Sequence, residues 1–236
     1  MKTIFIGTYY QLKTFLRIKK ALFFSFFFPS FSYVIFSMVW GFDNPDYKEF
    51  LLTGIITLTV VSDSLFSIGS VMVEYYQNGL IKFFKVIPYS FNKHLIALFL
   101  SRIIIIIFSV ILVLIIAFVF DHIIFSYLEF LYVSIGVISG IIMFSFLGII
   151  IAALTKENTQ SLSITNVLFF SIIFLSETFY PLGEINKAFT KVIMINPITP
   201  ILKLTRGNID LVSLLSWIIV LAVIQYVFFV KTKITG

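Results

Sequence analysis

Six long apolar runs decide which folds are open to this chain. They cover residues 21–40, 50–73, 95–120, 128–154, 162–179 and 211–230. A helix needs roughly 20 mostly apolar residues to cross about 30 Å of hydrocarbon, and each run is close to or above that length. None shows the period-two alternation of a membrane barrel strand. The sequence therefore predicts an all-α integral membrane protein with six transmembrane helices, in a single transmembrane domain over residues 1–236.

The composition excludes a water-soluble fold. Hydrophobic residues make up 60% of the chain, charged residues only 12%, and there are 30 Phe. A soluble domain could not bury so much apolar surface, so the lipid bilayer must be the solvent. The net charge of +6 does not indicate nucleic acid, because the basic residues gather beside apolar runs, as they do when they orient a membrane protein. Cysteine is absent, which excludes disulfides and thiolate sites.

The positions of Lys and Arg predict the orientation. Basic residues gather ahead of the first run, in the loop at 74–94 and in the tail, whereas the loop around Asp121 has none. Positive charge marks the cytoplasmic side, so both termini and the 74–94 loop are expected in the cytoplasm of a multi-pass protein. The segment 180–210 conflicts with this rule, because it is basic but must face outside if the spans number six.

The first 20 residues precede the first run and show an amphipathic pattern. Leu12, Phe15 and Leu16 share one helical face, opposite Lys13 and two further cations at 17 and 20. This separation predicts an interfacial helix over residues 1–20 that lies on anionic headgroups. The alternative is a cytoplasmic extension of the first span. The apolar run behind it is too long for the core of a signal peptide, so it is expected to stay in the protein.

Asp63 lies near the middle of the second run, where an acid costs on the order of 3 kcal/mol to insert. Thr53, Thr57, Ser64 and Ser67 fall at steps of four, seven and three residues and form a polar stripe near it. Intramembrane acids mark pathways or substrate contacts by default, so we expect a translocation path here. The alternative is a buried Asp bonded to neighbouring hydroxyls for packing.

Two other charged residues have simpler explanations. Glu177 lies at the outer end of the fifth run, where the free-energy cost of placing an acid is small. Either a gate or a solvated helix end would explain it. Arg102 lies in the third run within reach of the cytoplasmic surface, and snorkelling would explain it.

Gly136, Gly140 and Gly148 repeat at multiples of four on the fourth run. This spacing makes a small-residue face that another helix can approach closely. Packing inside the chain and packing between subunits both fit the pattern.

Enzyme signatures are missing from the chain. Its two histidines, His94 and His122, fall on opposite sides of the membrane in this topology, so they cannot form a paired metal site. No Gly-x-Ser-x-Gly elbow and no phosphate-binding Gly-x-x-x-x-Gly-Lys-Ser/Thr loop occurs. We therefore expect no catalysis and no metal, and any nucleotide that energises the protein must bind another chain.

The 74–94 loop carries a short apolar segment in a charged setting. Gly79 begins it, Leu80, Phe83 and Phe84 form its apolar face, and Pro88 ends it. An exposed apolar helix of this kind fits a hydrophobic groove on a soluble partner.

These features together resemble the membrane subunits of type-2 ABC exporters, over nearly the whole chain. The resemblance rests on motifs in the family's order: Gly79 to Pro88-Tyr89-Ser90, Leu175-Ser176, Phe179-Tyr180-Pro181, Asn196-Pro197-Ile198-Thr199 and Arg206-Gly207. The chain departs from the family where Tyr75-Tyr76-Gln77-Asn78 follows a lone Glu74 in place of Arg/Glu pairs, where Glu177 replaces a common glycine, and where Asn186 replaces a common proline.

The resemblance implies a permease subunit in a bacterial cytoplasmic membrane, paired with a second permease and with a cytoplasmic ABC ATPase that binds ATP and Mg. It implies a coupling helix over residues 79–91 and short re-entrant helices in the external segment 180–210. The residues expected to contact the ATPase are Glu74, Gly79, Leu80, Lys82, Phe83, Phe84 and Pro88. Those expected at the external gate are Glu177, Phe179, Tyr180 and Pro181.

The expected cargo is a drug, a peptide or a lipid-like molecule, because the spans are rich in Phe and poor in charge. The rival interpretation is a membrane scaffold that only tethers a soluble partner. An integral-membrane enzyme is a distant third, since no paired acids or histidine cluster supports it.

Overall fold

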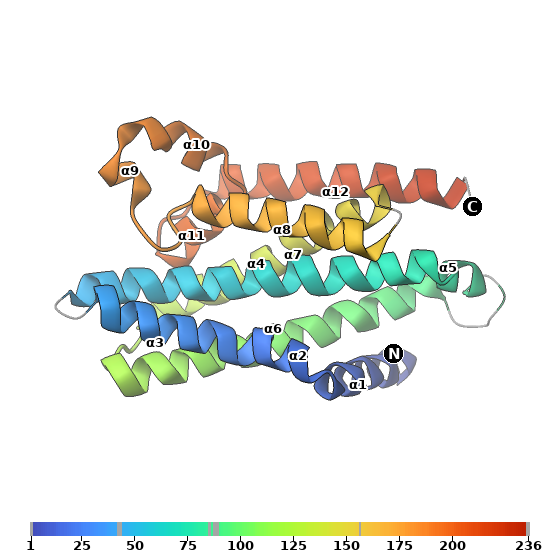
Figure 1. The fold of residues 1–236 in the computed structure, drawn as a ribbon, viewed down its shortest axis with the longest axis horizontal. Helices are drawn as coiled ribbons and strands as arrows, with labels where there is room; N and C mark the ends of the chain where they lie inside the picture. Colours follow the sequence, from blue (N-terminus) through green and yellow to red (C-terminus); the bar gives the residue numbers. More distant parts are fainter. Residues whose placement is uncertain (1, 42–43, 85, 87–89, 156, 235–236) are drawn as a thin grey trace.

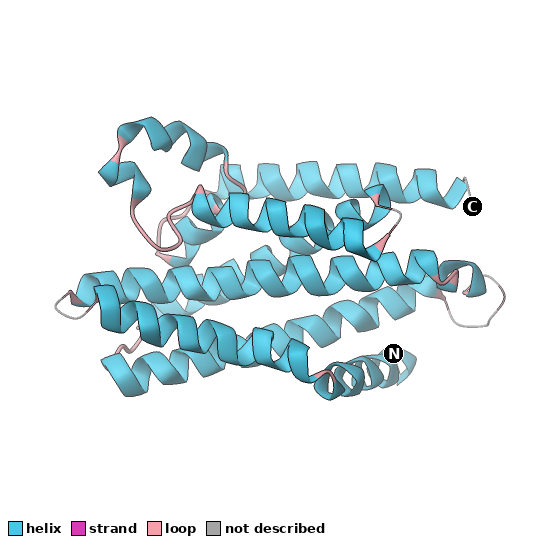
Figure 2. Cartoon of the chain, in the orientation of Figure 1, coloured by secondary structure: helices cyan, strands magenta, loops and turns pink. Residues whose placement is uncertain are grey.

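The computed structural model describes residues 2–41, 44–84, 86, 90–155 and 157–234, and every regular element in that part of the chain is a helix (Figures 1 and 2). The elements are α1 (Lys2–Arg17), α2 (Lys19–Leu22), η1 (Phe23–Phe27), α3 (Phe28–Trp40), α4 (Pro45–Gln77), α5 (Leu80–Phe83), α6 (Phe91–Asp121), α7 (Tyr127–Leu154), α8 (Asn158–Phe174), α9 (Leu182–Ile185), η2 (Lys187–Phe189), α10 (Thr190–Ile195), α11 (Thr199–Thr205) and α12 (Leu211–Ile234). The predicted all-α class is confirmed.

Five stretches of helix in the described residues are long and apolar enough to cross a membrane. They are Phe23–Trp40, Pro45–Tyr75, Phe91–Asp121, Tyr127–Leu154 and Leu211–Phe228. They correspond to five of the six predicted spans. The remaining one is α8, whose 17 residues reach about 26 Å at 1.5 Å per residue.

The predicted end of the fifth run, at residue 179, is wrong, because α8 ends at Phe174. The last carbonyls of a helix need outside donors, and here a side chain from beyond the helix supplies them. Asn196 Nδ2 donates to the carbonyls of Ile172 and Leu175, at 2.8 and 3.0 Å. These carbonyls are therefore satisfied without a further helical turn, and the chain can bend away.

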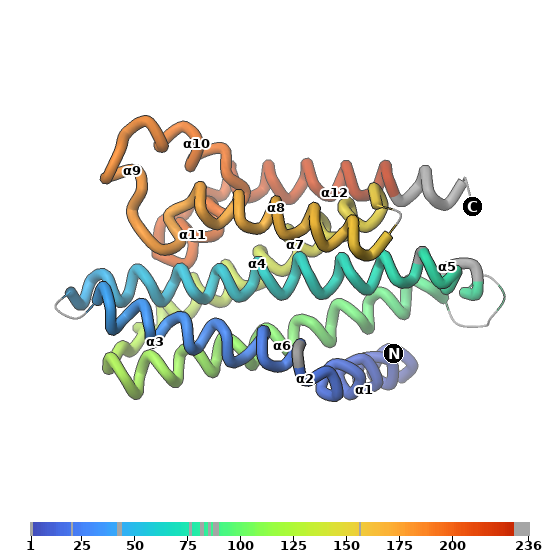
Figure 3. Tube along the Cα trace, in the orientation of Figure 1, coloured from blue at the N-terminus to red at the C-terminus, as the bar shows by residue number. Residues whose placement is uncertain are grey.

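The two ends of the bundle differ in character. The beginning of α1, the short helix α5 and the end of α12 lie at one end, where Figure 1 also marks both termini. The end of α3, the beginning of α4 and the helices α9 and α10 lie at the opposite end, where the trace leaves the bundle before returning through α11 (Figure 3). We call this end the outer end, after the predicted orientation. The structure thus places both termini and α5 at the same end of the bundle, as the distribution of Lys and Arg predicts.

Helix α4 is the centre of the bundle, and it packs against α3, α6, α7, α8 and α11. The glycine face of α7 turns toward α4 and α11. A Cβ on Gly148 would lie 3.0 Å from the Leu65 carbonyl oxygen, and one on Gly140 would lie 2.8 Å from Val60 Cγ1. A Cβ on Gly136 would meet the Thr205 side chain at 2.6 Å. Of the two uses left open for these glycines, the structure shows the packing inside the chain.

Helix α1 lies beside the first part of α6 and covers Arg102. The Arg102 side chain is buried, and its guanidinium lies 4.9 Å from the centre of the Phe15 ring. The snorkelling explanation is therefore wrong, since α1 closes the route from Arg102 to water. On the predicted apolar face of α1, Phe15 is buried and Leu12 is half-buried, but Leu16 is exposed. The position of α1 on the membrane surface stays a prediction.

Candidate functional site

The carboxylate of Asp63 meets a hydroxyl from the first span. Ser25 Oγ, in η1, donates to Asp63 Oδ1 at 2.6 Å. The second oxygen, Oδ2, is buried and has no hydrogen-bond partner among the described residues. The charge of Arg102, on α6, also acts on Asp63, although no ion pair joins the two in the described part of the chain. One oxygen of the Asp63 carboxylate therefore has a hydrogen-bond partner, and the other has none among the described residues.

The local sequence explains why Ser25 reaches this position. Pro29 has no N–H, so it cannot donate to the Ser25 carbonyl as a normal helical residue would. The helix widens to a π-turn over Phe23–Phe27, in which the Phe28 N–H bonds to the Phe23 carbonyl. The hydroxyl of Ser109, on α6, donates to the Ser25 carbonyl instead. Single π-turns of this kind are frequent at functional sites.

The predicted polar stripe does not gather around the Asp63 carboxylate. Ser67 donates to the Asp63 backbone carbonyl rather than to its side chain. Ser64 is buried, and its Oγ has no partner among the described residues. Thr57 donates to the Thr53 carbonyl at 2.8 Å and lies 3.5 Å from Thr205 Oγ1, nearer the outer end of α4. Sequence spacing along one helix missed the contributing residue, Ser25, because it comes from another helix.

A groove of about 410 Å³ opens beside Asp63. Its polar lining is Ser62, Asp63 and Asn166. Its apolar lining is aromatic and comes from η1, α3, α4 and α8. These residues are Phe24, Phe28, Phe66, Phe169 and Phe170. The groove therefore lies between the first span, α4 and α8, and combines one carboxylate with an aromatic wall.

The four predicted gate residues lie together at the outer end of the bundle. Glu177 Oε1 accepts a hydrogen bond from the Gly183 backbone at 3.1 Å. The Phe179 ring packs edge-on against Phe36, with 5.1 Å between ring centres, and Tyr180 packs likewise against Trp40 at 5.1 Å. Pro181, half-buried, leads into α9. The turn after α8 is thus held against the first span.

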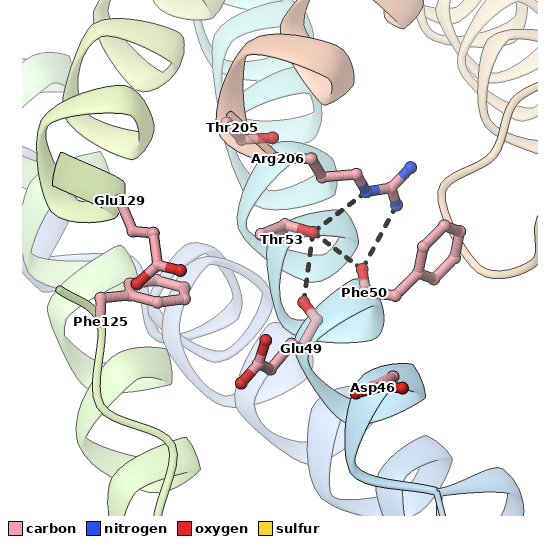
Figure 4. A pocket seen from close by; sticks show the side chains of 8 residues that line it. All are labelled: Asp46, Glu49, Phe50, Thr53, Phe125, Glu129, Thr205 and Arg206. Carbon is pink, nitrogen blue, oxygen red and sulfur yellow. Dashed lines mark hydrogen bonds between the residues drawn. The ribbon is translucent and has the colours of Figure 1, made fainter. Parts of the chain in front are cut away.

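Arg206 joins this turn to α4 and α11. Its Nη2 donates to the Phe50 carbonyl at 3.3 Å and its Nε donates to Thr53 Oγ1 at 3.2 Å (Figure 4). Nη2 also donates to the Glu177 carbonyl at 2.8 Å. The guanidinium also lies 3.7 Å from the centre of the Phe50 ring. A pocket of about 240 Å³ opens beside it, with Asp46, Glu49 and Glu129 among its lining residues (Figure 4). Arg206 is therefore a structural clamp for the outer end.

The basic residues of segment 180–210 are partly accounted for by their contacts. Lys203 pairs with Asp210 at 2.9 Å and holds the pKa of that carboxyl below its ordinary value. Arg206 is occupied by backbone carbonyls, whereas Lys187 and Lys191 are exposed.

Sequence reasoning missed a second network, which fastens the first three predicted spans at the outer end. Asp121 accepts hydrogen bonds from Lys48 at 2.6 Å, from Tyr33 at 2.7 Å and from Ser37 at 2.7 Å. One acid thus binds α3, the beginning of α4 and the end of α6. The sequence did offer one signal for this ion pair. Asp121 is a lone acid at the end of the third run, and Lys48 is the lone lysine of the loop after the first run.

The predicted coupling segment forms a short helix, α5, after Gly79, whose φ of 64° is left-handed. Phe83 is 54% exposed. The expectation that Leu80 and Phe84 are also exposed is wrong, because both are half-buried. The Phe84 ring lies 5.0 Å from the His94 ring, and it also packs on Phe91. Glu74 is exposed, whereas Pro88 and the Lys82 side chain lie outside the described part of the chain.

A polar cluster adjoins Phe84 through His94. The Tyr75 hydroxyl and His94 Nε2 are 2.7 Å apart, and Gln11 Nε2 donates to the Tyr75 hydroxyl at 3.2 Å. These residues belong to α4, α6 and α1. The helix α5 is therefore connected through Phe84 to three helices at once.

We predict that Arg206→Lys destabilises the outer end. Lysine keeps the charge but cannot reproduce the planar fork that reaches Phe50, Thr53 and Glu177 together. Leaving these part-buried carbonyls without donors costs about 1 kcal/mol or more, so the purified protein should melt a few degrees lower. Lys191→Arg, at an exposed position, is the matched control and should leave the melting temperature unchanged. An unchanged melting temperature for Arg206→Lys would show that the clamp contributes little.

The fold and its sites define a multi-pass helical membrane protein, with no cluster of potential metal ligands in the described residues. A comparison with protein families matches residues 3–209 to the ABC-2 type transporter family. The chain therefore belongs to that family, and the predicted resemblance is confirmed. It is a transport permease, not itself a catalytic chain. No curated protein matches the sequence.

Proposed function

We propose that this chain is the permease subunit of an ATP-driven exporter, which forms the translocation path and couples to a separate cytoplasmic ABC ATPase. The observation that carries the coupling is α5, whose Phe83 is exposed while its neighbour Phe84 is anchored inside the bundle. A large aromatic side chain presented on a short helix is a typical anchor for a hydrophobic groove on a partner.

The contacts behind α5 supply a route for the mechanical step. A displacement of Phe84 acts directly on His94 at the beginning of α6. Through the hydrogen bonds of Tyr75 with His94 and Gln11, it also acts on the end of α4 and on α1. Closure of the ATPases on ATP and Mg would thus bias the packing of several helices together, as in other two-state switches.

The groove beside Asp63 is the proposed path. It would receive an amphipathic cargo such as a drug, a peptide or a lipid-like molecule, since its wall is aromatic and its one charge is partly unsatisfied. In this proposal α8 also crosses the membrane, as the fifth of six spans, and Thr57, Ser64 and Ser67 continue the polar side of α4. The residues Glu177, Phe179, Tyr180 and Pro181 form the external gate above it.

The assembly is proposed to contain two permease subunits, identical or homologous, in a bacterial cytoplasmic membrane with both termini inside. A scaffold that only tethers a soluble protein would also need α5. It would have no use for a groove that pairs a carboxylate with five phenylalanines, so the groove favours transport.

Cross-linking tests this function. The chain has no cysteine, so Phe83→Cys gives a single thiol on α5. Labelled with a maleimide–benzophenone reagent and irradiated in membranes, this thiol should cross-link to an ABC ATPase chain, identified by mass spectrometry, because the excited benzophenone inserts into C–H bonds of whatever chain lies beside it. Phe130→Cys, which is as exposed as Phe83 (54% each) but on α7, should give no such product. If Phe83→Cys cross-links to no ATPase, the proposed coupling surface is wrong.

Thiol labelling tests the orientation. Single cysteines at Asp46 and Lys187, both exposed, should react with an impermeant maleimide in intact cells. Cysteines at Asn78 and Lys93, also exposed, should react only after the cells are opened. Labelling of position 78 in intact cells would show that the predicted orientation is wrong.

A further inference from the structure

We propose that the groove beside Asp63 selects amphipathic cations, such as organic ammonium or phosphonium compounds with bulky apolar groups. The cationic centre would pair with the Asp63 carboxylate, and the apolar groups would lie on the phenylalanine wall. This inference rests on the proposed function, because it assumes that the groove belongs to the path.

The hydrogen bonding of Asp63 is the first argument. Oδ1 is satisfied by Ser25, whereas Oδ2 has no partner in the described residues although it is buried. A buried carboxylate oxygen without a partner is costly, and a cation is the group that relieves it best. The other polar lining groups, from Ser62 and Asn166, carry no charge, so the groove itself has a single negative centre.

The aromatic wall is the second argument. Five phenylalanines line the groove around this carboxylate. The face of an aromatic ring is negative, so it attracts a cation and does not attract an anion. Aliphatic side chains would provide the same apolar surface without this preference, and the groove has none among its described lining residues.

The position of Arg102 is the third argument. It is the cation whose charge acts on Asp63, but it is buried beneath Phe15 and does not line the groove. Asp63 is therefore the charged residue among the described lining of the groove, and the guanidinium of Arg102 is not part of that lining. An anionic cargo would find no cation to pair with among the described lining residues.

Two size-matched probes of opposite charge test the inference: tetraphenylphosphonium and tetraphenylborate. Binding of each is measured by equilibrium dialysis to the permease–ATPase complex in nanodiscs of zwitterionic lipid, with empty nanodiscs subtracted. Wild type should bind the phosphonium saturably and the borate no more than empty nanodiscs do. If wild type binds neither ion, or binds both equally, the inference is overturned without any variant.

The variants then locate the site. Asp63→Asn should weaken phosphonium binding at least tenfold, because the charge is lost while the shape is kept. Arg102→Gln should strengthen it severalfold, because the opposing charge is removed. Glu184→Gln, an exposed acid on α9, is the matched control and should change nothing. Equal phosphonium binding by Asp63→Asn and wild type would overturn the proposal.

ATP hydrolysis and retention of the ATPase are recorded on the same samples. A complex that keeps its ATPase and hydrolyses ATP, yet does not distinguish the two ions, would retain the proposed function and disprove only the cation selectivity. Loss of ATPase association in wild type would instead remove the proposed function itself.

Discussion

Replacing Phe83 by Asp is expected to release the ATPase from the permease while the permease still inserts and folds. The side chain is 54% exposed and packs little inside the chain, so its loss should not destabilise the bundle. As an anchor in a partner groove, however, an aromatic side chain contributes about 2–4 kcal/mol, and a buried carboxylate in its place adds a desolvation cost. An affinity loss of about 30-fold or more follows, since each 1.4 kcal/mol is tenfold.

Co-purification of the ATPase with the tagged permease measures this loss. Phe130→Asp is the matched control, because Phe130 has the same exposure but lies near the beginning of α7, at the other end of the bundle. It should keep the ATPase at full yield. Phe84→Asp should behave differently again, lowering the melting temperature, because Phe84 packs on His94 and Phe91. Full retention of the ATPase by Phe83→Asp would place the docking surface elsewhere.

The helices themselves were predictable because their signal is local. A run of about 20 apolar residues has to be helical in a bilayer, where each backbone group must be satisfied within its own segment. The orientation of the ends stays a prediction from the distribution of charge, which thiol labelling tests. Boundaries were less predictable. The end of α8 depends on Asn196, which lies more than 20 residues further along the chain and satisfies its last carbonyls.

The site was only partly predictable, because its partners come from different helices. Asp63 stands out in the sequence as an acid in an apolar run. Its partner Ser25 does not, because its position depends on the π-turn before Pro29 and on Ser109. Arg206 shows the same limit, because each of its three hydrogen-bond partners lies 29 or more positions away from it in the sequence. Periodicity along one helix cannot predict which residues of other helices will contact it.

The close packing of α4 against the turn after α8 leads to the second large effect, at Gly54. A Cβ on Gly54 would lie 2.0 Å from the Thr178 carbonyl oxygen and 3.0 Å from its carbon. These are backbone atoms of a fully buried residue, so no side chain can rotate away and the turn itself must move. Overpacking costs typically 1–3 kcal/mol, and more where backbone is displaced. Alanine would regain about 1 kcal/mol of helix propensity, which does not offset that cost.

We therefore expect Gly54→Ala to lower the melting temperature of the purified permease clearly, or to reduce its folded yield. Gly79→Ala is the matched control. A Cβ there meets nothing within 4 Å but forces alanine to φ +64°, which costs roughly 1–2 kcal/mol and acts only on the turn before α5. Because Thr178 lies between Glu177 and Phe179, the displaced turn in Gly54→Ala should also break the contacts of both, whereas Gly79→Ala should leave the outer end intact. A melting temperature for Gly54→Ala at or above that of wild type would mean that α4 and this turn are not packed as closely as the structure has them.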